Sequence, residues 1–271
     1  MGNHLIVTSS KRDRNHFNSL QPQFQAADPM GKRTVLITGC TKGGIGYSLA
    51  KEFAAHDWHV FATARRISTM DGLSSIPNIT LLSLDITSRE SILAAHSKIA
   101  SETNEKLDIL YHNAGYRSLG LAIETSSDEA FKMFNANLFG ILEMNNVFAD
   151  MVIKTKGKIV FTGSVSGYTP HPTSSVYVAS KAALSMYAET LRIEMKPFGV
   201  KVIHVATAAV NTGMSAARLD IAKGTLSCSS SSGCVTDTFQ SPYINILKWQ
   251  STRAGQIWKG EQWARIFMLK G

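Results

Sequence analysis

Short runs of β-branched residues alternate with helix-length stretches through the middle of this chain of 271 residues. A strand, a helix and another strand in succession form a βαβ unit, so this alternation predicts a parallel sheet with helices packed on it. The length suits one open α/β domain. We therefore expect a single domain built on a doubly wound parallel sheet. The expected strands cover residues 34–38, 59–64, 79–86, 107–113, 157–163 and 200–206.

Two long helices are expected beside this sheet. Apolar residues between Phe131 and Met151 recur mostly at helical spacing, which predicts a long helix packed on the strands. A second helix is expected over residues 174–195, after the turn-rich segment YTPHPTS.

The two ends of the chain lack this regular pattern. Residues 1–31 are polar and show no helical or strand period, so we expect a disordered extension before a core over residues 32–214. Residues 215–271 form an atypical C-terminal segment. Of the net charge of +8, residues 1–33 carry +3, residues 215–271 carry +4 and the middle carries +1, which argues against a nucleic-acid surface. We find no apolar run long enough for a transmembrane helix.

Cysteine usage points to a reducing compartment. The three cysteines, Cys40, Cys228 and Cys234, cannot all pair, and no secretory signal is evident. Cys228 and Cys234 have poor spacing for zinc and no neighbouring histidine, so no metal is expected. We expect a cytoplasmic protein.

A glycine-rich loop follows the first strand in LITGCTKGGIG at residues 36–46. Because a helix comes next, its free N–H groups and partial positive charge favour a dinucleotide pyrophosphate. The alternative is a tight turn without a ligand. We interpret the loop as a Rossmann-type dinucleotide cradle, in which Gly43 is an extra residue that lets a longer turn close. The key residues of the cradle are expected to be Gly39, Gly44, Ile45 and Gly46.

The end of the second strand predicts the cofactor. NAD-binding proteins carry an acid here for the ribose 2′-hydroxyl, whereas this chain reads FATARR, with Arg65 and Arg66. Lys42 lies in the glycine loop. We therefore expect NADP(H), with Lys42 and Arg65 holding the 2′-phosphate; the alternative is that the arginines are solvated at a strand end.

The pair Tyr177 and Lys181 is the strongest chemical signal. Residues four apart share one face of a helix, so the lysine can favour the phenolate, whose free pKa is about 10. The spacing alone is weak, because Tyr47 and Lys51 repeat it. We interpret that second pair as helix surface.

Ser164 ends the fifth strand, thirteen residues before Tyr177. A hydroxyl at the carboxyl edge of the sheet can bind a substrate carbonyl. Ser166, eleven residues before Tyr177, is the competing candidate.

Five motifs in order resemble the short-chain dehydrogenase/reductase family over residues 33–214. They are the glycine loop, HNAG at 112–115, NANLFG at 135–140, TGSVSG at 162–167 and YVASK at 177–181. The resemblance implies a catalytic tetrad: Tyr177 protonates the carbonyl oxygen, Ser164 orients it, Lys181 lowers the tyrosine pKa and holds the nicotinamide ribose, and Asn137 supports a water chain. It also implies cofactor contacts at Asp85, Asn113, Tyr177, Lys181, Val210 and Thr212.

Within this family the chain is most similar to fungal NADPH-dependent 1-acyldihydroxyacetone-phosphate reductases. The resemblance implies reduction of a ketone to a secondary alcohol, on a lipid-type ketone or in a natural-product pathway. The alternative is a non-catalytic, redox-sensing NADP(H)-binding protein with a degenerate substrate pocket. Association with the endoplasmic reticulum or a lipid droplet, and a homodimer, are left open.

The chain departs from the family pattern in three places. His112 replaces an asparagine, and we expect this to be tolerated because Asn113 is intact. Thr207 and Ala208 stand where many members carry Pro-Gly. Residues 215–271 do not resemble the family's substrate lid and last helix.

Overall fold

The computed structural model describes residues 31–208, 210–212 and 258–259, and a six-stranded parallel sheet forms the centre of the first of these ranges. The strands follow the order β3-β2-β1-β4-β5-β6, and this order confirms the expected doubly wound sheet. The sheet reverses its winding between β1 and β4, where ligands of such folds bind at the carboxyl ends of the strands. The strands are β1 (Thr34–Ile37), β2 (His59–Ala64), β3 (Ile79–Ser83), β4 (Ile109–His112), β5 (Lys158–Thr162) and β6 (Lys201–Val205).

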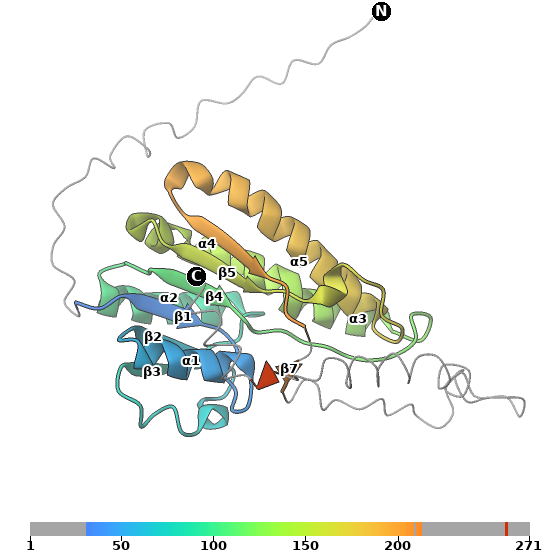
Figure 1. Cartoon of the computed structure of the whole chain (residues 1–271), viewed down its shortest axis with the longest axis horizontal. Helices are drawn as coiled ribbons and strands as arrows, with labels where there is room; N and C mark the ends of the chain where they lie inside the picture. Colours follow the sequence, from blue (N-terminus) through green and yellow to red (C-terminus); the bar gives the residue numbers. More distant parts are fainter. Residues whose placement is uncertain (1–30, 209, 213–257, 260–271) are drawn as a thin grey trace, which may run out of the picture.

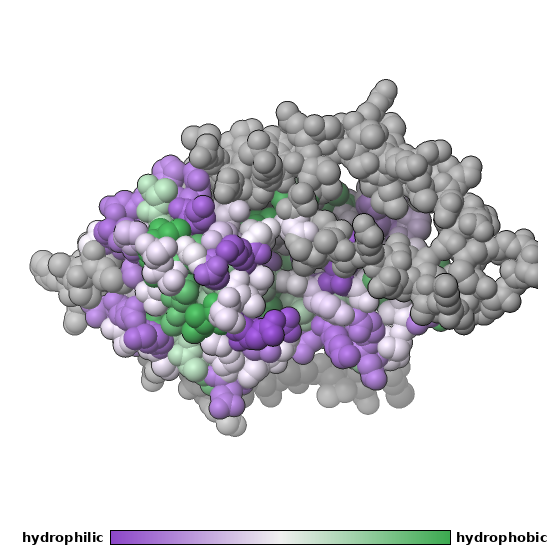
Figure 2. Space-filling model, turned by 90° about the horizontal axis from the view of Figure 1, so that it is seen from below, coloured by the Kyte–Doolittle hydropathy of each residue, from purple (hydrophilic) through white to green (hydrophobic). Residues whose placement is uncertain are grey.

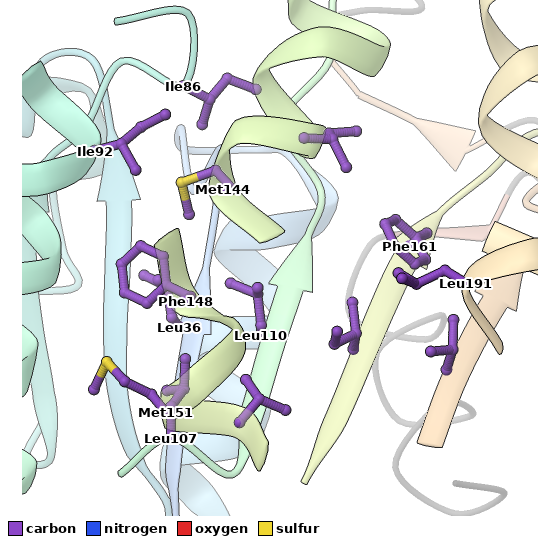
Figure 3. Packing of buried hydrophobic residues seen from close by; sticks show 14 of the residues in the cluster. Leu36, Ile86, Ile92, Leu107, Leu110, Met144, Phe148, Met151, Phe161 and Leu191 are labelled. Carbon is purple, nitrogen blue, oxygen red and sulfur yellow. The ribbon is translucent and has the colours of Figure 1, made fainter. Parts of the chain in front are cut away.

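Helices cover both faces of the sheet (Figure 1). Helix α1 packs on one face, where Val35 and Ile37 of β1 meet Phe53. Helices α2, α4 and α5 pack on the other face, around Leu36 and Phe148; Figure 3 shows these two side chains close together. Because both faces are covered, the strands are apolar throughout rather than alternating. The longer helices are α1 (Ile45–Ala55), α2 (Arg89–Thr103), α4 (Gly140–Thr155) and α5 (Ser175–Glu194).

The expected long helix around residues 131–151 is divided in the structure. Helix α3 (Ser127–Phe134) passes into a π-helical turn, η2 (Asn135–Phe139), before α4 begins. A π turn adds a residue to one turn without ending the helix, so the chain stays helical across it and the sequence pattern does not reveal the interruption. The turn carries Asn137, one of the predicted site residues.

Two strands, β3 and β4, are shorter in the structure than the sequence pattern predicts. β3 ends at Ser83 rather than at residue 86, and β4 ends at His112. Asp85 and Asn113 therefore lie in the turns beyond the strands, at the carboxyl edge of the sheet. Short 3-10 helices complete the described part: η1 (Ile67–Met70), η3 (Val165–Gly167) and η4 (Lys196–Phe198).

A separate two-stranded parallel sheet joins β7 (Val210–Asn211) to β8 (Trp258–Lys259). Apart from Gly31 and β8, the expected N-terminal extension and C-terminal segment lie outside the described residues. The domain boundaries therefore stay predictions.

The surface of the described part is mixed in character. Figure 2 shows hydrophilic and intermediate residues over one face, with hydrophobic residues gathered in a small area. None of the described helices is long and apolar enough to cross a membrane.

Candidate active site

A cleft of about 700 Å³ opens at the carboxyl edge of the sheet, between the ends of the strands and the start of α1. Most of the predicted site residues line it: Gly39, Lys42, Gly44, Ile45, Arg65, Asp85, Asn113, Tyr177, Lys181 and Thr212. Four others are buried and are not part of its lining: Gly46, Asn137, Ser164 and Val210. The fold thus collects residues from six separate segments around one space.

The glycine loop is packed tightly against the loop that follows β4. A Cβ atom on Gly39 would lie 2.8 Å from the Cα of Ala114, and one on Gly46 would lie 2.6 Å from the carbonyl oxygen of Gly39. Only glycine permits this close approach. The N-terminus of α1, capped by Gly44, therefore faces the cleft. Gly43 has open space around its Cα but a φ of +78°, so the turn itself favours glycine there.

Asn113 holds this loop in place. Its Nδ2 donates hydrogen bonds to the carbonyl oxygens of Thr38 at 2.9 Å and Gly39 at 3.0 Å. Its Oδ1 accepts a hydrogen bond from the hydroxyl of Thr162 at 3.3 Å. The side chain thus ties together the ends of β1, β4 and β5.

Two cationic side chains, Arg65 and Lys42, line the cleft near the end of β2. Arg65 is exposed and lines the cleft, whereas Arg66 is exposed outside it. Lys42 forms a 2.8 Å ion pair with Asp71 on the surface, and this pairing raises the pKa of Lys42. Binding a ligand phosphate would require Lys42 to exchange Asp71 for the phosphate; such exposed pairs contribute little stability.

Tyr177 and Ser164 lie close together. Tyr177 lies in the first turn of α5, and the hydroxyl of Ser164 is near enough to influence the pKa of its phenol. Burial raises the pKa of Tyr177, while Ser164 and the charge of Arg117 act to lower it. Ser164 Oγ also accepts a 3.1 Å hydrogen bond from the backbone N–H of Ser166. Ser164 is therefore the serine beside the phenol.

Lys181 is buried below the phenol. Its Nζ donates a hydrogen bond to the carbonyl oxygen of Thr162 at 3.0 Å and lies 6.0 Å from the centroid of the Tyr177 ring. Burial lowers the pKa of Lys181 to about 8. The groups that act to lower the pKa of Tyr177 in this structure are Ser164 and Arg117, and the expected contribution of Lys181 stays a prediction.

Asn137 joins the π-helical turn to its surroundings. Its Nδ2 donates to the carbonyl oxygen of Tyr116 and to the hydroxyl of Ser180, both at 2.9 Å. Its Oδ1 accepts from the N–H of Tyr116 at 2.8 Å. The amide therefore fastens the loop after β4 to α5, and its expected part in a water chain stays a prediction.

The family model for the short chain dehydrogenases matches residues 33–221. The chain belongs to this family. The matched range includes the glycine loop, the tetrad positions and every described part of the cleft.

Relatives within the short-chain dehydrogenase family come from fungi. The chain is 39% identical over 181 residues to the NADPH-dependent 1-acyldihydroxyacetone phosphate reductase of Schizosaccharomyces pombe, covering 67% of this chain and 61% of that protein. It is 42% identical over 183 residues to the short-chain dehydrogenase PC-15 of Penicillium crustosum, covering 68% of each. The chain thus matches only about two thirds of the length of these relatives.

Solved structures agree with this assignment. The structure of ElxO with NADP bound has a TM-score of 0.63 and 32% identity, covering 68% of this chain and 77% of that one. A short-chain dehydrogenase from Streptomyces avermitilis also has a TM-score of 0.63, with 29% identity covering 68% of each chain, and this likeness confirms the expected fold.

His112, a departure from the family pattern, is buried in the core and has a hydrogen-bond partner there. Its Nε2 lies 2.8 Å from Asn145 Oδ1, and its ring stacks on Phe161 at 5.0 Å between centroids. Burial lowers the pKa of His112 to about 4, so the ring is neutral. The imidazole is a satisfied interior group, away from the lining of the cleft.

Arg117 is a site residue that the motifs did not single out. It follows the NAG motif by two positions, and its guanidinium Cζ lies 5.9 Å from the centroid of the Tyr177 ring. The signal in the sequence was a cation in the loop directly after β4, where this fold places ligands. Spacing alone could not reveal it, because the contact joins residues sixty positions apart.

Proposed function

We propose that the protein is an NADPH-dependent oxidoreductase that reduces a ketone to a secondary alcohol. One observation carries this proposal: Tyr177 and Lys181 line the same cleft as the glycine loop, and the buried Ser164 lies beside the phenol of Tyr177. A proton donor, a hydrogen-bonding hydroxyl and a dinucleotide cradle in one space are what carbonyl reduction by a nicotinamide requires.

The cleft suits NADP(H). The pyrophosphate would lie at Gly39, Gly44 and Gly46, against the N–H groups that begin α1. Arg65 and Lys42 would hold the 2′-phosphate beyond β2. The remaining predicted contacts are Ile45, Asp85, Asn113, Tyr177, Lys181, Val210 and Thr212. The named S. pombe relative is NADPH-dependent, and the ElxO structure holds NADP, which supports the same cofactor here.

Each catalytic side chain has a defined part in the proposed reaction. The cofactor supplies a hydride to the carbonyl carbon when bound. Tyr177 gives its phenolic proton to the carbonyl oxygen, and the Ser164 hydroxyl donates a hydrogen bond that orients that oxygen. Lys181, held by Thr162, places a positive charge below the phenol, which favours the phenolate left after proton transfer. Asn137 keeps the surrounding loop and helix together.

The substrate is proposed to be a lipid-type ketone, such as an acyl-dihydroxyacetone phosphate, or an intermediate of a natural-product pathway. The S. pombe relative, a 1-acyldihydroxyacetone phosphate reductase, supports the lipid class, and the natural-product class stays a prediction. Location at a lipid surface and a homodimer stay predictions.

The test is reduction by the purified full chain. NADPH oxidation is measured with acyl-dihydroxyacetone phosphate, simple aliphatic ketones and polycyclic ketones, and the product alcohol is identified by mass spectrometry. Reduction of at least one ketone class is expected. A chain that binds NADPH tightly yet oxidises it with none of these ketones contradicts the proposal and favours the non-catalytic alternative.

A further inference from the structure

Arg117 lies in the chain between residues that line two different hollows, although it is not itself part of either lining. Tyr116, just before it, lines the cleft, and Ser118, just after it, lines a second hollow of about 270 Å³. The same succession occurs on α5, where Val176 lines the second hollow and Tyr177 lines the cleft. Two segments therefore run from the second hollow to the cleft, and on one of them the guanidinium Cζ of Arg117 lies 5.9 Å from the centroid of the Tyr177 ring.

The guanidinium of Arg117 lacks a partner of opposite charge in the part of the chain that the structure describes. Its Nε is buried without a hydrogen bond, and none of the described ion pairs includes it. Arginine remains charged in proteins, and a charge removed from water is normally paired. The nearest described ring, that of Tyr177 at 5.9 Å, offers only a weak cation–π contact.

The second hollow limits where an anion can lie. Its lining includes two carboxylates, Glu124 and Glu129, together with hydroxyl-bearing residues and with Leu119, Gly120, Met133 and Val176. Glu129 accepts a hydrogen bond from the hydroxyl of Tyr116 at 2.5 Å, whereas Oε1 of Glu124 is buried without a partner. Because these carboxylates repel an anion deep in the hollow, an anionic group is favoured at the Arg117 end, beside Tyr177.

We propose that Arg117 binds an anionic group of the substrate, a phosphate or a carboxylate, a few bonds from the ketone carbon. The guanidinium fork suits either group, since both accept two parallel hydrogen bonds. This inference rests on the proposed function, because it places the substrate carbonyl at Tyr177. It makes Arg117 a specificity-determining residue, which distinguishes anionic from neutral ketones.

The first experiment measures binding and does not depend on turnover. Hexyl phosphate, hexanoate and neutral hexanol are titrated calorimetrically into the full chain with NADP⁺ present. Arg117→Met is expected to weaken binding of the preferred anion about tenfold to a hundredfold, the usual worth of charged hydrogen bonds. Arg117→Lys, which keeps the charge, should weaken it less. Arg192→Met is the matched control, because Arg192 pairs with Glu189 on the exposed side of α5.

Several outcomes overturn the inference. They are no measurable binding of either anion to the wild type, equal binding to wild type and Arg117→Met, and equal weakening by Arg192→Met. Thermal unfolding shows whether Arg117→Met is folded; if it is not, Arg117→Lys and Arg117→Gln replace it. If no ketone is reduced, the proposed function is contradicted. The calorimetric result separately decides whether Arg117 binds an anion.

A kinetic comparison separates substrate binding from an effect on the phenol. A keto acid and its methyl ester are reduced by wild type and Arg117→Met across pH. For the acid, KM is expected to rise about tenfold to a hundredfold more than for the ester, because only the acid loses a charged hydrogen bond; any effect through the pKa of Tyr177 is shared by both substrates. An equal loss for both, with a shifted pH profile, would mean that Arg117 acts on Tyr177 and would overturn the inference.

Discussion

The ammonium group of Lys181 donates a 3.0 Å hydrogen bond to the backbone carbonyl oxygen of Thr162, at the end of β5. The lysine is buried, and burial lowers its pKa from 10.5 to about 8. Among the described residues, the carbonyl oxygen of Thr162 is the hydrogen-bond partner of the Lys181 ammonium group, whose charge is disfavoured by burial. The arrangement suits a group that is proposed to hold a positive charge beside the phenol, and it makes stability depend on pH.

Replacing Lys181 with methionine is expected to remove this dependence. Between about pH 8 and pH 10.5 the unfolded chain binds more protons at this position than the folded chain, so Lys181 makes stability rise with pH across that window. The free energy of unfolding of wild type relative to Lys181→Met should therefore increase by up to about 3 kcal/mol from neutral pH to the upper limit. Urea unfolding at a series of pH values measures it, and a constant difference would contradict it.

Tyr177→Phe is expected to abolish most turnover and leave NADPH binding intact. The substitution removes only the phenolic oxygen, so the loss should be about a hundredfold to ten-thousandfold in kcat. Tyr47→Phe is the matched control, because Tyr47 has the same spacing to a lysine but its hydroxyl donates to the carbonyl of Asp71. A small loss in Tyr177→Phe would favour the redox-sensing alternative.

Arg65→Asp is expected to lower the preference for NADPH over NADH about tenfold to a hundredfold. The reason is that a charged hydrogen bond to the 2′-phosphate is replaced by repulsion. Arg66→Asp makes the same change of charge one residue along, outside the lining of the cleft, and should have a much smaller effect. Kd values for both cofactors measure the preference. An unchanged preference in Arg65→Asp would show that the 2′-phosphate lies elsewhere.

The glycine loop offers a comparison between two alanine substitutions. A methyl group at Gly46 meets the carbonyl oxygen of Gly39 and the amide of Asn113, so the loop must move, and the chain should lose about 1–3 kcal/mol of stability together with NADPH affinity. At Gly43 there is open space, and the positive φ alone costs about 1–2 kcal/mol.

Urea unfolding and NADPH titration of the two variants test this comparison. NADPH affinity is expected to fall much further in Gly46→Ala than in Gly43→Ala. The reason is that a methyl group at Gly46 would clash with the carbonyl oxygen of Gly39, whereas one at Gly43 meets no neighbouring atom. Equal affinities in the two variants would mean that the cradle does not depend on this contact.

Local pattern was sufficient for the architecture. Runs of β-branched residues predicted all six strands of the main sheet, and the order confirmed the doubly wound topology. Tyr177 and Lys181 were recognisable because four residues of a helix bring two side chains to one face. Patterns of this kind are short-range, so they can be recognised without knowing what the helix packs against.

Contacts between segments that are distant in the sequence could not be predicted from local sequence patterns. The π-helical turn at Asn137 keeps the chain helical, and the hydrogen bonds of its amide reach residues 21 and 43 positions away. Likewise, the ion pair of Lys42 with Asp71 depends on how η1 lies against the glycine loop.

The sequence alone therefore determined the fold class, the family and the chemical types at the cleft, because these follow from local periodicity and from motifs of a few residues. Tertiary packing decided which partner each charge meets. It buried Lys181 against Thr162 and set Arg117 beside Tyr177. Burial and partner charge control pKa and binding, and both are properties of the assembled interior rather than of any one segment.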